Sequence, residues 1–593
     1  MENIITTSNE TLSLHYLDWL AIAAFVLSLF MIGIITGKKE RETTQDYFLA
    51  GRKLPWYVVG TSLIAANISS EHLIGMIGSS FIFGICTAFF CWANIGAYSF
   101  LIWLFIPFLI SSKVFTIPEF LEKRFNPFVR QFFAVVTLIT NLFAFLAAVL
   151  YGGTIAVQEI FDTPFWPTVI IMGTFAGSLA IWGGLSSSSW SSLPTVLIIV
   201  LGGFMVTIFG LNSLASEAGG CGIVEGFKVM VERNLATTGQ WKLAAEAAAE
   251  HMPQQYNRMS VMLPVNHPIV PWVNWFFCIF SISIWYNALN QFMIQRVLGA
   301  KNSYHAKMGV ILAGFLQAIL PVIITLPGLI LFAMKPDIML QTWVDVKPEA
   351  DQGFIYMVTT LVPAGLCGLV LAALFGAIQS TINAVVNSTS TVLTIDIYKR
   401  MIHKNATDKQ LVKFGIISSI VILSLSIVIA GFIKSLNTSL FVYIQQLFAF
   451  FAPPFAAIFL LGILWYRING KGASVAVSSG FIAGVVLKTW EFKADLPGYL
   501  TFYFPGDMPS WLLPFYNQAA IVWIFATLVC IVVSFLTDPP APEQVTDQLV
   551  FNWQKINIFT GLGDKWYKSI VFWWVVLTLL VVFLILSFSG VFF

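Results

Sequence analysis

Charged residues are scarce in this chain of 593 residues: 10% of them are charged, whereas 58% are hydrophobic. A soluble globular domain carries about 25% charged residues, so this composition excludes that class. The formal net charge of +2 gives no sign of a nucleic-acid partner. The composition therefore predicts a protein that crosses a membrane many times.

Cysteine is also rare, and the six cysteines have neither the spacing of a metal site nor that of a disulfide framework. The chain has no glycine-rich phosphate loop and no recognisable pairing of a nucleophile with a base. These absences argue against an ATP-driven pump and against a membrane-embedded enzyme. Residues 1–16 lack the basic start of a signal peptide, so Leu17–Gly37 is expected to stay as a first span.

Long apolar runs are what the sequence has in abundance. A window of about 20 residues finds fourteen segments long enough to cross a bilayer. They are Leu17–Gly37, Trp56–Gly78, Thr87–Ser111, Val129–Val157, Pro164–Gly183, Leu193–Asn212, Val270–Gln291, Met308–Met334, Leu361–Ile382, Val412–Ile433, Ser439–Trp465, Gly472–Trp490, Ala519–Leu536 and Ile570–Phe593. We therefore expect an all-α polytopic membrane protein with about 14 transmembrane helices.

Basic residues gather in alternate loops between these spans, among them Lys38–Arg41, Lys123–Arg130 and Lys399–Lys413. Cytoplasmic loops carry such an excess, so both ends of the chain are expected outside the cell membrane. The largest outer insertion, residues 213–269, contains a helix-favouring stretch near Leu243–Glu250. We interpret the insertion as a cap over the surface, and a ligand site is the alternative.

The second span is interrupted by polar residues. Its segment LIAANISSEH, from Leu63 to His72, places Asn67, Glu71 and His72 among apolar neighbours. Hydrocarbon offers such side chains no hydrogen bonds, and an ionisable residue at its centre costs about 2.5 kcal/mol or more. A helix that tolerates them is expected to be broken and to line a binding cavity. The alternatives are a structural histidine, and a Glu71 that pairs with a neighbouring helix or caps the second half-helix.

The ninth span contains a second group of polar residues, at Ala377–Asn383. Their hydroxyl groups suit either hydrogen bonds between helices or the coordination of a hard cation. The break in the second span favours the cation, because carbonyl groups freed at Ala65 and Ile68 could join the hydroxyls of Ser380 and Thr381. Neutral oxygens of this kind suit Na+ better than a transition metal.

Several short motifs occur in order between residues 40 and 490. They are Asp46–Gly51, Leu54–Trp56, Ala65–Ser69, Phe115–Phe125, Asn290–Gln291, Gln295–Arg296, Leu326–Gly328, Asn387–Thr389, Asp396–Lys399 and Leu460–Gly462. Together they resemble the solute:sodium symporter family, and most closely its bacterial sodium/galactose branch. The resemblance implies a leucine-transporter type of fold, in which spans two to six and seven to eleven form two inverted five-helix repeats.

That fold divides the chain into five parts. They are an external N-terminus with an extra helix and a basic cytoplasmic loop (1–55), a first repeat (56–212), an extracellular insertion (213–269), a second repeat (270–466), and C-terminal helices with a cytoplasmic loop (467–593). The implied function is sodium-coupled import of a small neutral solute, a sugar or polyol, by alternating access, with Na+ as coupling ion and no other cofactor. A transporter-derived sensor that binds a solute without flux is the alternative, and a passive channel is another.

The resemblance also implies site residues. A sodium ion would be held by the backbone carbonyls of Ala65, Ile68 and Ala377 and the hydroxyls of Ser380 and Thr381. The solute would contact seven side chains, those of Asn67, His72, Cys91, Ser283, Tyr286, Gln317 and Gln445. Tyr286 would also act as an inner gate, and an apolar outer lid would consist of Met76, Phe90 and Phe441.

Three places depart from the family pattern. Cys91 stands where sugar transporters have a glutamate that binds hydroxyl groups, and Gln317 stands where a lysine is expected. The pocket thereby loses one acid and one base, which argues against a charged solute but removes charge-assisted hydrogen bonds worth about 1.5–3 kcal/mol each. Ser191–Ser192 and Thr195 stand where the family usually has a Thr-Asp pair and a Gln. The resemblance implies that this aspartate lies on the path by which sodium leaves to the cytoplasm. Its replacement by Ser192 is therefore expected to affect ion release.

Overall fold

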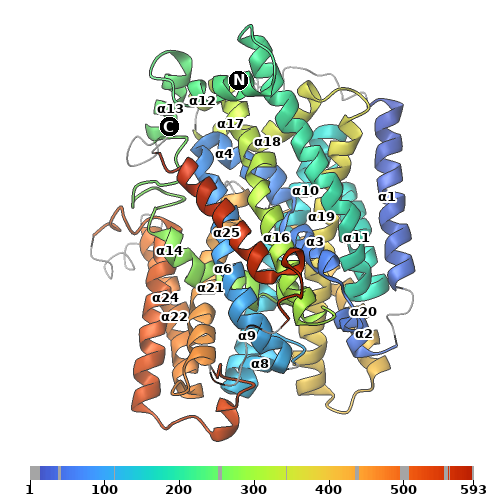
Figure 1. Cartoon of the computed structure of the whole chain (residues 1–593), viewed down its shortest axis with the longest axis vertical. Helices are drawn as coiled ribbons and strands as arrows, with labels where there is room; N and C mark the ends of the chain where they lie inside the picture. Colours follow the sequence, from blue (N-terminus) through green and yellow to red (C-terminus); the bar gives the residue numbers. More distant parts are fainter. Residues whose placement is uncertain are drawn as a thin grey trace.

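A computed structural model describes residues 14–37, 42–112, 114–250, 257–341, 343–433, 440–493, 506–552, 554, 559 and 561–590. The described residues are mostly helical and form no strand beyond two isolated β-bridges, Leu54 with Ala300 and Leu263 with Pro271. Long helices run side by side along the longest axis of the molecule (Figure 1). The expected all-α architecture is therefore confirmed.

Thirteen α-helices lie between residues 16 and 250 of the described chain. They are α1 (Tyr16–Gly37), α2 (Thr44–Leu49), α3 (Trp56–Asn67), α4 (Ile77–Phe83), α5 (Phe89–Trp92), α6 (Asn94–Phe100), α7 (Ile106–Ser112), α8 (Ile117–Arg124), α9 (Pro127–Thr140), α10 (Ala148–Phe161), α11 (Phe165–Glu217), α12 (Ile223–Asn234) and α13 (Gly239–Glu250). Wider π-helical turns join some of them, at Glu71–Met76, Leu101–Phe105 and Asn141–Ala147.

The next helix is short, α14 (Asn274–Cys278), and is followed by π-helical turns at Ile279–Ser283 and Trp285–Leu289. The helices after these turns are α15 (Gln291–Leu298), α16 (Ser303–Ile323), α17 (Thr325–Met334), α18 (Trp343–Leu361), α19 (Cys367–Val392), α20 (Asp408–Ile433), α21 (Leu440–Leu464), α22 (Gly470–Glu491), α24 (Phe515–Leu536) and α25 (Ile570–Ser587). A further π-helical segment, Leu393–Ile402, continues α19.

Eleven helices of the described residues are long and apolar enough to cross a membrane, or twelve if the bent pair Asn274–Leu289 and Gln291–Leu298 counts as one span. Each of the fourteen expected segments overlaps a helix. The counts differ because Pro164–Gly183 and Leu193–Asn212 lie in the single helix α11. In addition, the expected second span, Trp56–Gly78, is divided into pieces too short to cross alone.

A sharp bend at Gly183 and Gly184 separates the two expected spans within α11. Gly184 has φ of 56° and ψ of −141°, a conformation that other residues rarely adopt. A Cβ atom at this position would lie 2.2 Å from the backbone oxygen of Tyr47. Glycine is therefore required both for the bend and for the close approach of the 44–49 segment.

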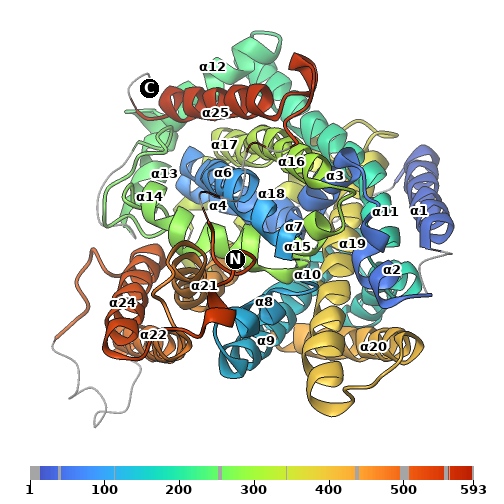
Figure 2. The same ribbon diagram turned by 60° about the horizontal axis from the view of Figure 1, so that its bottom comes forward.

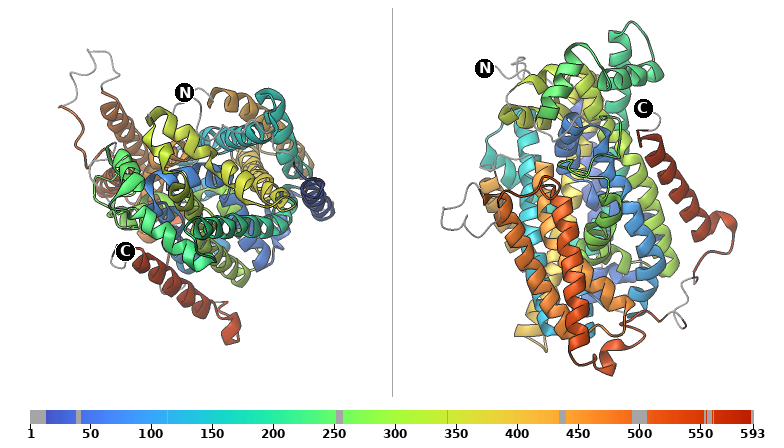
Figure 3. Two further views of the ribbon diagram at one scale, coloured as in Figure 1. Left: turned by 90° about the horizontal axis from the view of Figure 1, so that it is seen from above. Right: turned by 90° about the vertical axis from the view of Figure 1, so that its left-hand side faces the viewer.

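Helix α3 packs against α11, α16 and α19, and α11 also packs against α16 and α19. Helix α1 lies outside them, against α11 and α19 (Figure 2). Its buried Asp18 accepts hydrogen bonds from the backbone N–H groups of Gly365 (3.1 Å) and Gly368 (2.6 Å), which fixes the start of α1 to the start of α19. Helices α22 and α24 pair at one margin of the bundle, and α25 lies at another (Figure 3).

The start of α1, the helices α12 and α13, and the end of α25 lie at one end of the molecule, whereas α2 and α8 lie at the opposite end (Figure 1). Helix α13 confirms the expected helix near Leu243–Glu250. Arg258, in the same insertion, donates hydrogen bonds of 2.6 Å to the backbone oxygens of Phe81 and Ile82. The insertion thus covers the end of α4. Residues 251–256 of the insertion, and the basic residues Lys38–Arg41, lie outside the described residues.

Candidate functional site

The second expected span is broken, as its polar residues predict. Helix α3 ends at Asn67, and Ile68 is extended, with φ of −83° and ψ of 121°. The chain turns helical again through the wide turn Glu71–Met76 and continues as α4. Carbonyl groups at the end of α3 therefore lose their helical partners and become available to other groups.

Hydroxyl groups of α19 meet these carbonyl groups. The Ser380 hydroxyl donates to the carbonyl oxygens of Ala65 (2.5 Å) and Ala377 (3.0 Å). The Thr381 hydroxyl lies 3.1 Å from the carbonyl oxygen of Ile68 and 3.2 Å from that of Ala66. All five residues expected at the sodium site, namely Ala65, Ile68, Ala377, Ser380 and Thr381, thus come together in one buried cluster. The oxygen of Ala66 is an addition that the sequence did not indicate.

A second break lies at Asn290, which has φ of −64° and ψ of 121°. The helical axes on its two sides differ in direction by 54°. The family motif Asn290–Gln291 does not itself predict a break at this point. Two adjacent amide side chains at the end of an apolar run were the available signal.

A small cavity of about 40 Å³ lies beside the break in α3. Five of the seven expected solute contacts line it, together with Phe90 of the expected lid. The lining residues are Asn67, Glu71, His72, Phe89, Phe90, Ala93, Asn94, Cys278, Ile282, Ser283, Tyr286, Gln445, Phe448 and Tyr516.

The other two expected contacts, Cys91 and Gln317, are buried and do not line this cavity. The Asn67 amide donates to the side-chain oxygen of Gln317 (2.9 Å) and accepts a hydrogen bond from the Tyr286 hydroxyl (2.7 Å). In this arrangement Gln317 stands behind Asn67 and helps to fix its orientation.

The four residues expected to act as gates do not lie together. The ring of Phe90 packs edge-on against that of Phe441 (4.7 Å between centroids), and Phe441 in turn lies edge-on to His72 (6.4 Å). Tyr286 is held among Phe145, Phe292 and Phe448, with centroid distances of 6.2, 5.8 and 5.6 Å. Met76 is fully buried and does not line the cavity.

Several cavity residues were not predicted from the sequence. Tyr516 of α24 lines the cavity and donates a hydrogen bond to Gln445 (3.1 Å). Asn94, also in the lining, accepts a hydrogen bond from Asn287 (3.0 Å). Tyr516 lies at the start of a C-terminal helix outside the expected repeats, so neither hydropathy nor the motifs pointed to it.

The serine-rich segment Ser186–Ser192 is buried within α11. Ser192, which replaces the family aspartate, donates back to the carbonyl oxygen of Ser188 (2.9 Å). The side chain of Ser188 lies 3.5 Å from the guanidinium group of the buried Arg296. The departure in sequence therefore leaves hydroxyl groups where a carboxylate is expected.

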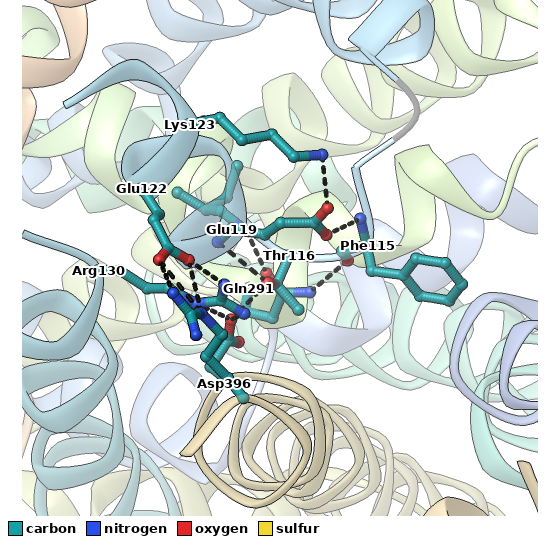
Figure 4. Close-up of polar contacts among 10 residues, drawn as sticks. Phe115, Thr116, Glu119, Glu122, Lys123, Arg130, Gln291 and Asp396 are labelled. Atoms are coloured by element: carbon teal, nitrogen blue, oxygen red, sulfur yellow. Dashed lines mark hydrogen bonds and ion pairs between the residues drawn. The ribbon is translucent and has the colours of Figure 1, made fainter. Parts of the chain in front are cut away.

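An ion-pair network occupies the end of the molecule where α8 lies (Figure 4). Arg130 of α9 pairs with Asp396, at 2.6 Å, and with Glu122. Thr116, which caps α8, donates to the same carboxylate of Asp396 (3.0 Å), and Arg400 pairs with Glu122 at 2.6 Å. The network joins α8, α9 and the π-helical continuation of α19.

A second connection in Figure 4 reaches α15. The side-chain oxygen of Gln291, the first residue after the break at Asn290, accepts a hydrogen bond from the backbone N–H of Ile117 (3.1 Å). Its amide group donates to the backbone oxygen of Phe115 (3.3 Å). The start of α8 is thereby attached to the half-helix that follows the break.

Protonation of Glu122 should weaken this network. The hydrogen bond from Arg400, together with Arg130, holds the pKa of the Glu122 carboxyl below its usual range despite partial burial. A lowered pKa adds stability above the pKa of the unfolded chain, and this stability is lost as the pH falls through the native value. We expect the melting temperature to fall as the pH is lowered from about 5 to about 3, and Glu122→Gln to reduce that pH dependence. An equally steep decrease in Glu122→Gln would contradict this assignment.

Comparisons with known proteins agree with this architecture. Residues 47–480 match the model of the sodium:solute symporter family. The sodium/glucose cotransporter of Vibrio parahaemolyticus is 31% identical over 93% of this chain and 97% of that protein. The sodium/myo-inositol cotransporter of Canis lupus familiaris is 30% identical over 89% of this chain and 74% of that protein.

A solved structure shares the fold. It is a Na+-coupled sialic acid symporter in a substrate-bound, outward-open state, with a TM-score of 0.70 and 20% sequence identity. The match covers 88% of this chain and 98% of that one. The expected leucine-transporter type of fold is confirmed. Since the family model matches well over half of its residues, the chain belongs to the sodium:solute symporter family.

Proposed function

We propose that this protein imports a small neutral solute, a sugar or a polyol, together with Na+ across the plasma membrane. The observation that carries the proposal is the meeting of the Ser380 and Thr381 hydroxyls with the carbonyl groups at the break in α3. The same break borders the cavity lined by Asn67 and Tyr286. One structural element thus contributes to both sites, which is what coupling of ion and solute requires.

Na+ is the cation that this oxygen cluster suits. The cluster offers carbonyl and hydroxyl oxygens that carry no formal charge, from Ala65, Ile68, Ala377, Ser380 and Thr381. Oxygens of this kind coordinate Na+ at the breaks in transporter helices. Transition metals prefer imidazole or thiolate ligands. The described residues contain no group of three or more His, Cys, Asp or Glu side chains placed to hold such a metal.

The cavity favours a hydroxylated solute. Its wall combines the aromatic rings of Phe90, Tyr286 and Phe448 with the polar side chains of Asn67, His72 and Gln445. Aromatic faces suit the apolar face of a sugar ring, and amide groups exchange hydrogen bonds with hydroxyl groups. Relatives named for glucose and for myo-inositol support the same class.

Transport would proceed by alternating access. Na+ between α3 and α19 would stabilise the state that receives the solute from outside, and its loss to the cytoplasm would loosen Tyr286 and release the solute. One charge that crosses 100 mV supplies about 2.3 kcal/mol, which corresponds to roughly fifty-fold accumulation before the sodium gradient is added.

The proposal includes an arrangement in the membrane. Residues 56–212 and 270–466 would form the two inverted repeats, and both ends of the chain would face outside with the 213–269 insertion. The end of the molecule with α2 and α8 would then be cytoplasmic. The shared location of α1's start, α12, α13 and α25's end supports this orientation (Figure 1).

Uptake and ligand stabilisation together test the function. In proteoliposomes, we expect an inward Na+ gradient to drive saturable uptake of labelled D-glucose, D-galactose or myo-inositol. In detergent, the same solute should raise the melting temperature more in Na+ than in choline, because coupled ligands tighten each other's binding. Stabilisation by succinate alone would contradict a neutral solute. Binding without uptake would indicate a sensor, and uptake independent of Na+ would indicate a channel.

A further inference from the structure

Glu71 is a buried carboxylate in the wall of the cavity. Its side chain is 5% exposed, and Oε1 lies 3.4 Å from Nδ1 of the neighbouring His72, a nitrogen without a hydrogen-bond partner among the described residues. Oε2 also forms no hydrogen bond with any residue that the structure describes. No lysine or arginine of the described residues lies within 4.0 Å of it. Among the described residues, no hydrogen bond or ion pair joins the Glu71 side chain to a neighbouring helix, and the turn Glu71–Met76 has no side-chain cap hydrogen bond.

Asn67 and Gln445, two other polar residues of the wall, already have partners. Asn67 holds both the Tyr286 hydroxyl and the Gln317 amide oxygen, and the side-chain oxygen of Gln445 accepts a hydrogen bond from Tyr516. Glu71 differs from these residues because an acceptor oxygen is left over. A buried acceptor without a donor is costly, so a donor is expected to come from whatever fills the cavity.

We propose that Glu71, with His72 beside it, binds adjacent hydroxyl groups of the solute and so determines specificity for polyhydroxylated molecules. The inference rests on the proposed function and deepens it. The two oxygens of the Glu71 carboxyl group suit two neighbouring hydroxyl groups. Asn67 and Tyr286 are hydrogen-bonded to each other and position the solute. Glu71 and His72 supply the strongest polar contacts with the solute.

The wide turn Glu71–Met76 explains how two adjacent residues both reach the cavity. In a regular helix, successive side chains point about 100° apart, so neighbours seldom share one face. A π-helical turn widens the helix and changes these directions, and such turns occur often at functional sites. Both Glu71 and His72 line the cavity in this structure.

The test combines a change in the protein with a change in the solute. The probes are D-glucose and myo-inositol, each compared with derivatives that lack one hydroxyl group. We expect the native protein to prefer the parent over at least one deoxy derivative by about tenfold or more in kcat/KM, as for loss of a hydrogen bond to a charged group. In Glu71→Gln the preference for that hydroxyl should fall to about twofold or less. Asp18→Asn, which neutralises a buried carboxylate remote from the cavity, should keep the native preference.

A structural role for Glu71 predicts a different result. Glu71→Gln would then lower uptake of parent and deoxy derivatives by the same factor and leave the preference unchanged, which would overturn the proposal. If Glu71→Gln is not recovered folded, Glu71→Asp makes the same comparison with a retracted carboxylate. Absence of Na+-driven uptake in the native protein would contradict the proposed function. Equilibrium binding of the same probes still tests Glu71 in that case, and no binding of any probe would overturn this inference as well.

Discussion

Replacement of both Ser380 and Thr381 by alanine is expected to abolish Na+-driven uptake while leaving the protein folded. The two hydroxyls supply two of the five oxygens proposed to hold the ion, and they connect α19 to the carbonyls at the break in α3. Each polar contact with a charged group contributes about 1.5–3 kcal/mol, so the loss of two should weaken Na+ binding at least about 100-fold. Uptake at increasing Na+ concentrations measures this loss directly.

Matched controls are available in the same protein. Ser388 of α19 and Thr154 of α10 are also buried, and their hydroxyls donate within their own helices, to the carbonyl oxygens of Val385 (3.1 Å) and Leu150 (2.7 Å). Ser388→Ala and Thr154→Ala remove the same atoms without affecting the oxygen cluster. We expect both to keep the native Na+ dependence. An equal loss in these controls would mean that general packing, and not ion binding, explains the effect.

The break in α3 was predictable from the sequence because polar and ionisable residues are expensive in hydrocarbon. Asn67, Glu71 and His72 stand out against an otherwise apolar segment, and the structure has an extended residue at Ile68. The break at Asn290 was harder to predict, since its amides lie at the end of an apolar run. Local composition reveals a break only when the polar residues lie well inside a span.

The remaining differences between the predicted and the observed site arise from contacts between distant parts of the chain. Tyr516 reaches the cavity from α24, and Gln317 stands behind Asn67 without lining the cavity. Neither position follows from hydropathy, because that signal gives the length of a helix and not its neighbours. The family resemblance implied a place for Gln317 at the site, but the hydrogen bond to Asn67 assigns it a supporting position.

Loss of Arg130 is the second large effect that the structure predicts. Arg130 pairs with Asp396, whose side chain is fully buried, and also with Glu122. Arg130→Ala leaves the carboxylate of Asp396 with only the Thr116 hydroxyl among the described partners. Removal of one member of a buried ion pair typically costs about 3–5 kcal/mol. A strongly lowered melting temperature of the purified protein is therefore expected.

A comparison with an exposed ion pair separates the effect of losing a buried partner from the effect of losing a positive charge. Lys123 pairs with Glu119 at 2.7 Å, but its side chain is half exposed, so Lys123→Gln should cost about 1 kcal/mol or less. Arg130→Met combined with Asp396→Asn should be less destabilising than the two single changes added together, because neither partner is then left alone. Additive effects of the two single changes would contradict a direct coupling.

Weakening the ion-pair network around Arg130 and Glu122 should also alter transport. The network ties α8 and α9 to the continuation of α19, and Gln291 ties α8 to the half-helix after Asn290. In the proposed orientation these elements separate when the cavity opens to the cytoplasm. Weakening them therefore favours the inward-open state over the outward-open state that Na+ stabilises. Glu122→Gln weakens the network without leaving a buried charge unpaired. It should therefore raise the Na+ concentration that gives half-maximal uptake. An unchanged value would show that the network takes no part in the gating motion.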